Sequence, residues 1–440
     1  MKATTTILLL FLTAFLGFSQ QKETPKNWSL ADCIQYALEN NITIKEAALT
    51  KKSADVNLRQ SEYARYPSLS ASVSQNATNG TSIDPITSNY VSQLIHSTNA
   101  GVGTQVTLFR GNYLNNTIRQ NELLVTQNEL FVSEAKNNIL LSVTEAYLQA
   151  LYYKEAIAVA QNTVNSSKEQ ISQAETKFKA GSIAKLDVAD LQTQFSNDQV
   201  TLITAQNNYR QQLISLKQLL ELDPLSEFDI ATPDLPEAQL IAPDLKSIYE
   251  TAVANMPEIA SAKTQIDISN VLLKKAKSGY LPTLSLNAGL YSGYTSTQNL
   301  DFVTQFDGNF YQTVGLNLSI PIFSNYSNKA AVQNAKIDIE KAKIASVSEI
   351  KQLYLKIESA WQNAQSAQGQ LEAATALKSS SQLAYEMAQK KSDAGALSSP
   401  DLIVSKNTYL SAQQQFLQAK YSMALYYQLL QFYQGNQIAI

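Results

Sequence analysis

Two carboxylates, Asp187 and Asp401, are the side chains whose type and spacing most clearly suggest a function. Each follows an Ala-Gly pair at the same interval, so the pattern Ala-Gly-x5-Asp begins at Ala180 and again at Ala394. Carboxylates that line a narrow aqueous passage attract cations and repel one another. A structural explanation is equally simple, because an acid in the first turn of a helix is favoured by the helix dipole. The sequence leaves both explanations open.

Enzyme chemistry has no candidate residues in this sequence. The chain has one cysteine, Cys33, and one histidine, His96, whereas catalytic dyads and Cys/His metal sites need partners for these residues. We expect His96 to lie in a polar loop and Cys33 to be a small buried residue of an amphipathic helix. We therefore expect no catalytic residues, no cofactor and no metal. A net charge of −3 without basic patches also argues against nucleic-acid binding.

The N-terminus predicts export. Lys2 precedes an apolar run over residues 7–18, which has the length of a signal-peptide core and is too short to span a bilayer. Residues 1–20 are therefore predicted to be a signal peptide, with cleavage near residues 19–21. No cysteine follows the run closely, so a lipid anchor is not expected.

The remainder contains the same unit twice, about 214 residues apart. The matching segments are Tyr66-Pro67-Ser68-Leu69 with Leu281-Pro282-Thr283-Leu284, Gly101 through Phe109 with Gly315 through Phe323, and Ala146-Tyr147 with Ala360-Trp361. We predict a first repeat over 21–235 and a second over 236–440. The first begins with a helix over 29–64, and a proline-rich connector over 221–244 joins the two repeats and wraps the outside. The second begins with a helix over about 244–279.

Each repeat is predicted to contain a very long helical hairpin. Glycine and proline are almost absent from 115–220 and 328–434, with glycines marking turns near Gly181 and Gly395. Apolar residues recur with a spacing of 3.5 from Ile139 to Phe178, and only Ser167 on this seam is polar. A 65-residue helix is about 100 Å long, too long for a compact globule.

Four segments are predicted to be strands: 67–79, 99–110, 282–293 and 310–323. Apolar and polar residues alternate along them, which is typical of transmembrane barrel strands and also of half-buried strands in a soluble sheet. The export signal and the absence of a globular core favour the membrane. Loops 80–98 and 294–309 would face outward, and aromatic residues cluster near the strand ends. These are Tyr90, Tyr291, Tyr294, Phe302, Phe306, Phe310 and Tyr311.

Four strands cannot close a barrel, and an open sheet edge in lipid would leave backbone groups unpaired. The membrane interpretation therefore requires an oligomer. Eight strands would be filled by their own side chains, so a water-filled pore of at least twelve strands fits better.

With these features the chain resembles the TolC-type outer membrane efflux channels over essentially its whole mature length. The helix beginning at Leu30, the strand entries at Pro67 and Pro282, Pro321-Ile322-Phe323 and both Ala-Gly-x5-Asp turns occur in the order of that family. The resemblance implies a mixed α and β membrane protein. It further implies a homotrimer that would form a twelve-stranded transmembrane β-barrel in outer membrane lipid, continued by a coiled-coil α-helical tunnel across the periplasm.

The same resemblance implies a passive exit channel of a tripartite efflux pump or a type I secretion system. A periplasmic adaptor would connect it to an inner-membrane transporter. The adaptor would dock on the hairpin tips, at Gly181, Ser182, Ile183, Ala184, Gly395, Ala396, Leu397 and Ser398. Asp401 matches a residue that lines the closed pore, and Asp187 is a second candidate.

Two positions depart from the family pattern. Val404 stands where some members have a second aspartate, and Leu397 stands where an Arg or Lys could lock a tip through an ion pair. The alternative function is a secreted coiled-coil structural or scaffold protein without a pore. The cargo is not encoded in any recognisable feature.

Overall fold

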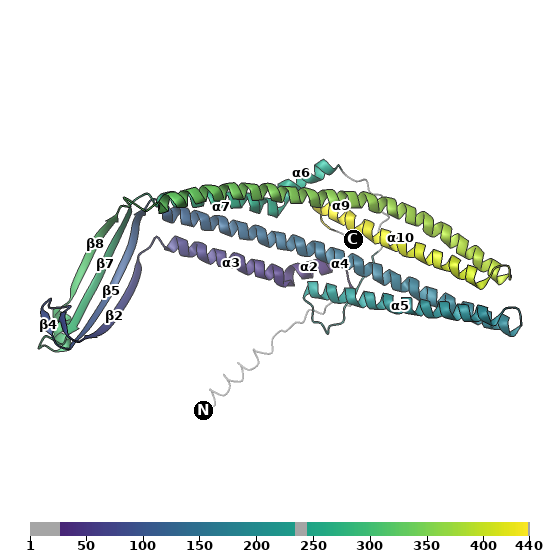
Figure 1. The fold of residues 1–440 in the computed structure, drawn as a ribbon, viewed down its shortest axis with the longest axis horizontal. Helices are drawn as coiled ribbons and strands as arrows, with labels where there is room; N and C mark the ends of the chain where they lie inside the picture. Colours follow the sequence, from purple (N-terminus) through teal and green to yellow (C-terminus); the bar gives the residue numbers. More distant parts are fainter. Residues whose placement is uncertain (1–26, 234–243, 439–440) are drawn as a thin grey trace, which may run out of the picture.

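The computed structural model describes residues 27–233 and 244–438 as a long molecule with a β-sheet at one end and two helical hairpins that reach the other end (Figure 1). The predicted signal peptide and part of the predicted connector lie outside the described residues. The helices are α2 (Leu30–Asn40), α3 (Ile42–Tyr63), α4 (Tyr113–Lys179), α5 (Lys185–Leu220), α6 (Leu245–Asn255), α7 (Pro257–Ser278), α8 (Phe302–Gly308), α9 (Ser327–Asp393) and α10 (Ser399–Tyr433). The strands are β1 (Asn27–Trp28), β2 (Ser68–Thr78), β3 (Thr81–Ile83), β4 (Tyr90–Ser92), β5 (Ile95–Arg110), β6 (Asp229–Ile230), β7 (Thr283–Thr295) and β8 (Tyr311–Ser319).

The main sheet is antiparallel with the order β2-β5-β7-β8, so β2 and β8 are its two edges. Successive side chains of each strand point to opposite sides, and the strands pair in register, so the sheet has two different faces. One face, here called the polar face, carries Ser, Asn, Thr, Gly and Gln residues together with two tyrosines, Tyr291 and Tyr311. The opposite, apolar face carries exposed Leu and Val side chains. Its most exposed members in the single chain are Leu69, Val73, Val314, Leu316 and Leu318.

The predicted alternation is interrupted at one point in β5. Thr107 pairs with Ser285 and Phe109 pairs with Leu284, so Leu108 is an extra residue in a β-bulge. Phe109 therefore lies on the apolar face, where simple alternation would place Leu108. The strand expected to extend to residue 323 ends at Ser319, because Pro321 cannot donate a ladder hydrogen bond.

The segments between the strands at the outer end, the end of the sheet far from the helices, are more ordered than predicted. Residues 80–98 contain the hairpin β3-β4, and residues 294–309 contain the helix α8. The expectation that His96 lies in a loop is wrong. His96 belongs to β5, which starts at the buried Ile95 because Ile95 pairs with Thr78 of β2.

The two long hairpins, α4-α5 and α9-α10, bury the predicted 3.5-residue seams. On α9 the buried positions include Leu353, Ile357, Ala360 and Ala364. Alanine at many of these positions allows the helices to approach closely, and both α4 and α9 are 67 residues long. The hairpins are therefore held by a narrow seam rather than by a globular core.

Two predicted helices are each divided in two. Residues 29–64 form α2 and α3, because Asn41 leaves the helical conformation and its side chain accepts a hydrogen bond from Thr43 N. Residues 244–279 form α6 and α7, because Pro257 occupies the first position of α7 and favours an extended residue before it. Near the middle of the molecule β1 pairs in parallel with β6, and Tyr147 donates a hydrogen bond to Trp28 O at 3.1 Å.

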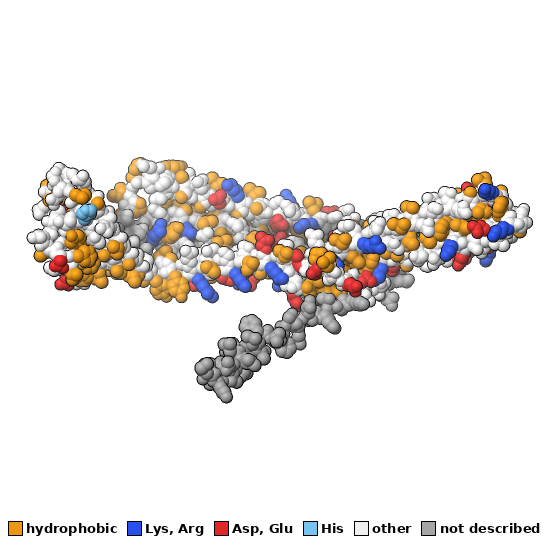
Figure 2. All heavy atoms as spheres, turned by 90° about the horizontal axis from the view of Figure 1, so that it is seen from below, with side chains coloured by type: hydrophobic (Ala, Val, Ile, Leu, Met, Phe, Trp, Pro, Cys, Tyr) orange, Lys and Arg blue, Asp and Glu red, His pale blue; other side chains and the backbone are white. Residues whose placement is uncertain are grey.

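None of the described helices has a segment long and apolar enough to cross a bilayer. The distribution of side chains differs along the molecule. Figure 2 shows apolar side chains gathered over the sheet end, while Lys, Arg, Asp and Glu lie mainly over the helical part.

Candidate functional site

The hairpin tips are built by the same local structure in both repeats. Gly181 and Gly395 have φ of 78° and 73°, a left-handed conformation that glycine adopts without strain. Ser182 N donates to Lys177 O at 3.0 Å and Gly181 N donates to Phe178 O at 2.9 Å, which is a Schellman C-cap. The second tip repeats this arrangement one for one. Both glycines are thus explained by the turn, and their surfaces remain open to a partner.

The two predicted carboxylates both begin the returning helices. Asp187 Oδ2 accepts a hydrogen bond from Ala184 N at 3.1 Å. Asp401 Oδ2 accepts from Ser398 Oγ at 2.6 Å, and Asp401 N donates back to the same hydroxyl at 3.3 Å. The structural explanation given above for these residues therefore holds in the single chain. It does not remove the pore explanation, because the exposed Asp401 side chain keeps free acceptor capacity.

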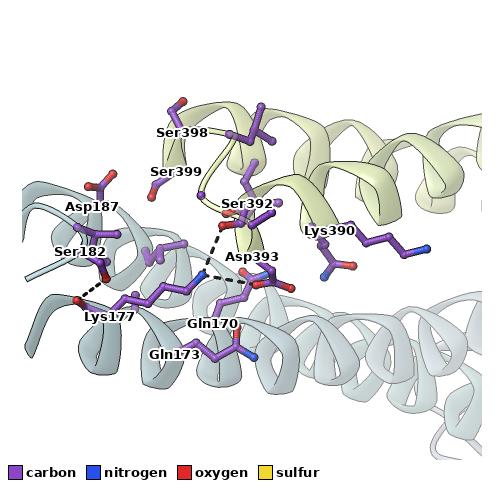
Figure 3. Close-up of a pocket in the computed structure, with 18 of the residues that line it drawn as sticks. Gln170, Gln173, Lys177, Ser182, Asp187, Lys390, Ser392, Asp393, Ser398 and Ser399 are labelled. Atoms are coloured by element: carbon purple, nitrogen blue, oxygen red, sulfur yellow. Dashed lines mark hydrogen bonds and ion pairs between the residues drawn. The ribbon is translucent and has the colours of Figure 1, made fainter. Parts of the chain in front are cut away.

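A cavity of about 950 Å³ separates the two tips within one chain. Its walls come from both hairpins, and Asp187 lies in the lining whereas Asp401 does not. Figure 3 shows Lys177 of the first hairpin reaching across toward Ser392 and Asp393 of the second. The Lys177 Nζ to Asp393 Oδ1 distance is 3.7 Å, and Nζ donates to Ser392 O at 3.4 Å. Because this ion pair is largely exposed, it contributes at most about 1 kcal/mol.

The other predicted tip residues are mostly exposed. Ile183 and Leu397 are half-buried, and Leu397 packs against the small cluster of Tyr385, Ala388 and Leu402. The structure therefore places all eight predicted docking residues at one end of the molecule. It separates the two candidate pore carboxylates, which do not line the same cavity.

Sequence reasoning missed a buried polar cluster that joins the two hairpins farther from the tips. Lys406 Nζ of α10 lies 2.7 Å from Asp198 Oδ2 of α5, and both residues are almost fully buried. Gln194 Nε2 donates to Asp198 Oδ1 at 2.8 Å and contacts Asn407 Oδ1 at 3.2 Å. Ser167 of α4 hydrogen-bonds to both Lys406 and Asp198. We call these five residues the interhairpin polar cluster.

One sequence signal did mark this cluster. Ser167 is the single polar residue on the otherwise apolar seam of the first long helix, and it is 2% exposed. A polar residue at a seam position is costly unless it has partners, so its presence predicts a buried polar contact. Lys406 and Asp198 gave no such signal, because charged side chains on helices are ordinarily solvent-exposed.

The described residues contain no group of three or more His, Cys, Asp or Glu side chains that could hold a metal ion. The cavity between the tips, the exposed turns and the cluster that joins the hairpins together define a candidate site for contact with another protein. At the opposite end of the same molecule the apolar face of the sheet is exposed in the single chain, as expected for strands that face lipid.

Comparison with known proteins identifies the family. The model of the outer membrane efflux protein family matches residues 33–221 and 248–436, one segment in each repeat. The chain belongs to the outer membrane efflux protein family, and this membership confirms the expected location in the outer membrane.

Two relatives and one solved structure illustrate the similarity. Alkaline protease secretion protein AprF of Pseudomonas aeruginosa is 25% identical over 317 residues, which cover 70% of this chain and 63% of AprF, less than two thirds of that relative. Outer membrane protein TolC of Vibrio cholerae is 22% identical over 331 residues, 75% of this chain and 72% of TolC. The crystal structure of the CmeC outer membrane channel of Campylobacter jejuni matches with a TM-score of 0.79 at 21% identity. That match covers 96% of this chain and 92% of CmeC, and it shows a shared fold.

Proposed function

We propose that three copies of this chain close into a twelve-stranded barrel that continues into a helical tunnel. The observation that carries this proposal is that the sheet and the layer of helices beside it end at matching edges. The sheet ends at β2 and β8, and the helical layer beside it, in which α3 packs on α4, α4 on α7 and α7 on α9, ends at α3 and α9. Since α3 leads into β2 and β8 leads into α9, one interface between neighbouring copies completes both layers.

The edge helices carry unpartnered apolar stripes that support the same interface. On α3 the exposed residues Ile42, Leu49, Val56 and Tyr63 recur every seven residues and are 61–70% exposed in the single chain. On α9, Ile344 is 71% exposed and Val347 is 52% exposed. Apolar residues at heptad spacing favour packing against another helix, so the α9 edge of one copy fits the α3 edge of the next.

In this assembly the apolar face of the sheet contacts lipid and the polar face surrounds water. The protein then acts as a passive outer membrane exit channel, the outer component of a tripartite efflux pump or a type I secretion system. The resemblance to secretion and efflux proteins such as AprF and CmeC supports this function. The polar face and the polar cavity between the tips suit water-soluble cargo. A secreted structural protein without a pore would leave the apolar face and both sheet edges exposed to water.

We propose further that the tips close the inner end of the tunnel and that Asp401 lines the constriction. Three Asp401 side chains around a narrow axis would concentrate cations. Substitution Asp401→Asn keeps an acceptor for the Ser398 hydroxyl but removes the charge, so we expect cation selectivity in planar bilayers to fall while trimers still form. Asp187→Asn is the matched control and is expected to leave selectivity unchanged. Equal selectivity of wild type and Asp401→Asn would rule out this constriction.

The exposed tips are the proposed docking site of the periplasmic adaptor. No heavy atom lies within 4 Å of a Cβ added at Gly181 or Gly395, so bulkier residues there meet a partner before they meet the chain itself. We expect Gly395→Asn, which tolerates the left-handed conformation, to retain binding better than Gly395→Arg. The measurement is co-purification of the adaptor with each variant. Undiminished recovery with Gly181→Arg and Gly395→Arg together would place docking elsewhere.

A further inference from the structure

The outer end of the sheet carries a turn that folds over the polar face. Residues Asp84–Thr87 lie between β3 and β4, and a Cβ added to Gly293 of β7 would meet Ile86 Cδ1 at 2.7 Å. The same hypothetical atom lies 2.9 Å from Asn99 Oδ1, the cross-strand neighbour on the polar face. Ile86 therefore rests on the polar side of the sheet.

Asp84 fastens this turn. Its side chain is fully buried, and its Oδ1 accepts hydrogen bonds from Ile86 N and Thr87 N, both at 2.9 Å. Its Oδ2 accepts from Thr295 Oγ1 at 2.6 Å and from Thr297 Oγ1. Thr295 and Thr297 belong to the second repeat, so the four hydrogen bonds to Asp84, here called the clasp, join the outer segments of both repeats. Four donors satisfy a carboxylate that has no cationic partner among the described ion pairs.

The segment that contains α8 strengthens the attachment on the second repeat. Gln305 is 2% exposed, and its side chain accepts from Thr295 N at 2.9 Å and donates to Thr295 O at 3.0 Å. Asn309 Nδ2 donates to Gly293 O at 2.8 Å. These hydrogen bonds take the place of the strand-to-strand hydrogen bonds that β7 lacks at its outer end. The turn is therefore attached to an ordered segment of the second repeat.

Two stacked tyrosines lie next to this turn on the polar face and add to the bulk there. Tyr291 and Tyr311 are cross-strand neighbours whose ring centroids are 5.4 Å apart, and the ring of Tyr291 lies over Gly101 where a side chain would collide with it. A cavity of about 440 Å³ remains between the turn, the tyrosines and the strands, lined by Ser72, Ser74, Ile86, Asn99, Tyr291 and Tyr311 among others. Bulky groups thus gather at one level of a face otherwise covered by Gly and by polar, non-aromatic side chains.

We infer that the Asp84–Thr87 turn and the Tyr291–Tyr311 pair form a second constriction, at the outer mouth of the channel, which limits the size of molecules that enter the lumen from outside. This inference rests on the proposed barrel, in which the polar face lines the lumen and three copies of the turn surround one axis. The hairpin tips, where the inner constriction is proposed, lie at the opposite end of the molecule from this turn (Figure 1). The outer constriction is therefore independent of the gate at the tips.

The test uses cysteines labelled from outside intact cells with a small thiosulfonate and with a bulky polymer-linked maleimide. Ser70→Cys places a thiol on the polar face deeper than the turn, and Asn89→Cys places one on the exposed rim as a control. The native Cys33 gives no background, because burial and, secondarily, Asp32 raise its pKa to about 12 and keep it an unreactive thiol.

We expect the small reagent to label Ser70→Cys readily and the bulky reagent to label it at least about tenfold more slowly than Asn89→Cys. Asp84→Ala, which releases the clasp, should raise the bulky-reagent rate at Ser70→Cys. Ile86→Ala should raise this rate too. Because it leaves the clasp intact, it provides the test even if Asp84→Ala fails to fold. A bulky-reagent rate that is already equal at Ser70→Cys and Asn89→Cys, or that stays unchanged in both Asp84→Ala and Ile86→Ala, would overturn the outer constriction while leaving the channel intact. If the small reagent labels Asn89→Cys but does not label Ser70→Cys, this result would instead contradict the proposed lumen, and the constriction with it.

Discussion

An arginine at Leu316 is expected to prevent assembly of the protein in the outer membrane, whereas an arginine at the adjacent Asn317 is expected to be tolerated. Leu316 lies on the apolar face of β8 and is 68% exposed in the single chain, and Asn317 lies on the polar face. A charged residue that faces lipid near the bilayer midplane costs about 2–4 kcal/mol, and the proposed trimer would contain the change three times.

The two variants differ by one position and carry the same added charge, so they separate the orientation of the sheet from general effects of an edge strand. The measurement is the amount of heat-resistant oligomer in outer membrane fractions. We expect Leu316→Arg to lose it and Asn317→Arg to keep it. The reverse order would mean that the polar face contacts lipid, and equal amounts would mean that neither face does.

Removal of one partner from the interhairpin polar cluster is expected to destabilise the packing of the two hairpins by about 3–5 kcal/mol. Lys406→Met leaves Asp198 as a buried carboxylate without its cation, and Asp198→Leu leaves a buried ammonium. The cluster contains residues of α4, α5 and α10, so its loss should let the two hairpins separate. Limited trypsin digestion measures this, because Lys177, Lys179 and Lys185 lie at the first tip.

The double variant Lys406→Met with Asp198→Leu is the decisive control. Replacement of a buried ion pair by apolar residues of similar size is often neutral or stabilising, so we expect it to recover most of the lost thermal stability and tip protection. Ser167 keeps a partner in it, because its hydroxyl also donates to Thr163 O at 3.0 Å. Single variants as stable as the wild type, or a double variant as damaged as the sum of the singles, would show that this pair does not hold the hairpins together.

The long helices and the four main strands could be predicted because their signals extend over many residues. The near absence of Gly and Pro and the 3.5-residue spacing determine α4 and α9, and alternation determines β2, β5, β7 and β8. The outer segments could not be predicted in the same way. Residues 80–98 and 294–309 are short and polar, and their order depends on distant contacts such as that between Asp84 and Thr295.

The tips illustrate a second limit. The Ala-Gly-x5-Asp pattern correctly located both turns, because the glycine conformation and the acidic helix start are local properties. The pattern did not reveal that Asp187 lines the cavity between the hairpins while Asp401 does not, because that depends on how the two hairpins pack. The Lys406–Asp198 pair was missed for the same reason, although Ser167 marked its place on the seam.

The proposed channel requires that β2 of one copy pairs with β8 of the next in a closed ring of three. Disulfide cross-linking tests it most directly, because a disulfide forms only when the two Cα atoms are about 4–7 Å apart. Gly315→Cys on the polar face of β8 is combined in turn with a cysteine at Ser70, Ser72 or Ser74 of β2. The apolar-face positions Leu69, Ala71 and Val73 of the same strand are the controls.

We predict covalent dimers and trimers and no larger species, for at least one polar-face position and for no apolar-face position, since side chains on opposite faces of a sheet cannot meet. A trimer as the largest product shows that the ring closes after three copies. Absence of cross-links at every polar-face position, or a ladder of products that extends beyond the trimer, would contradict the closed ring of three.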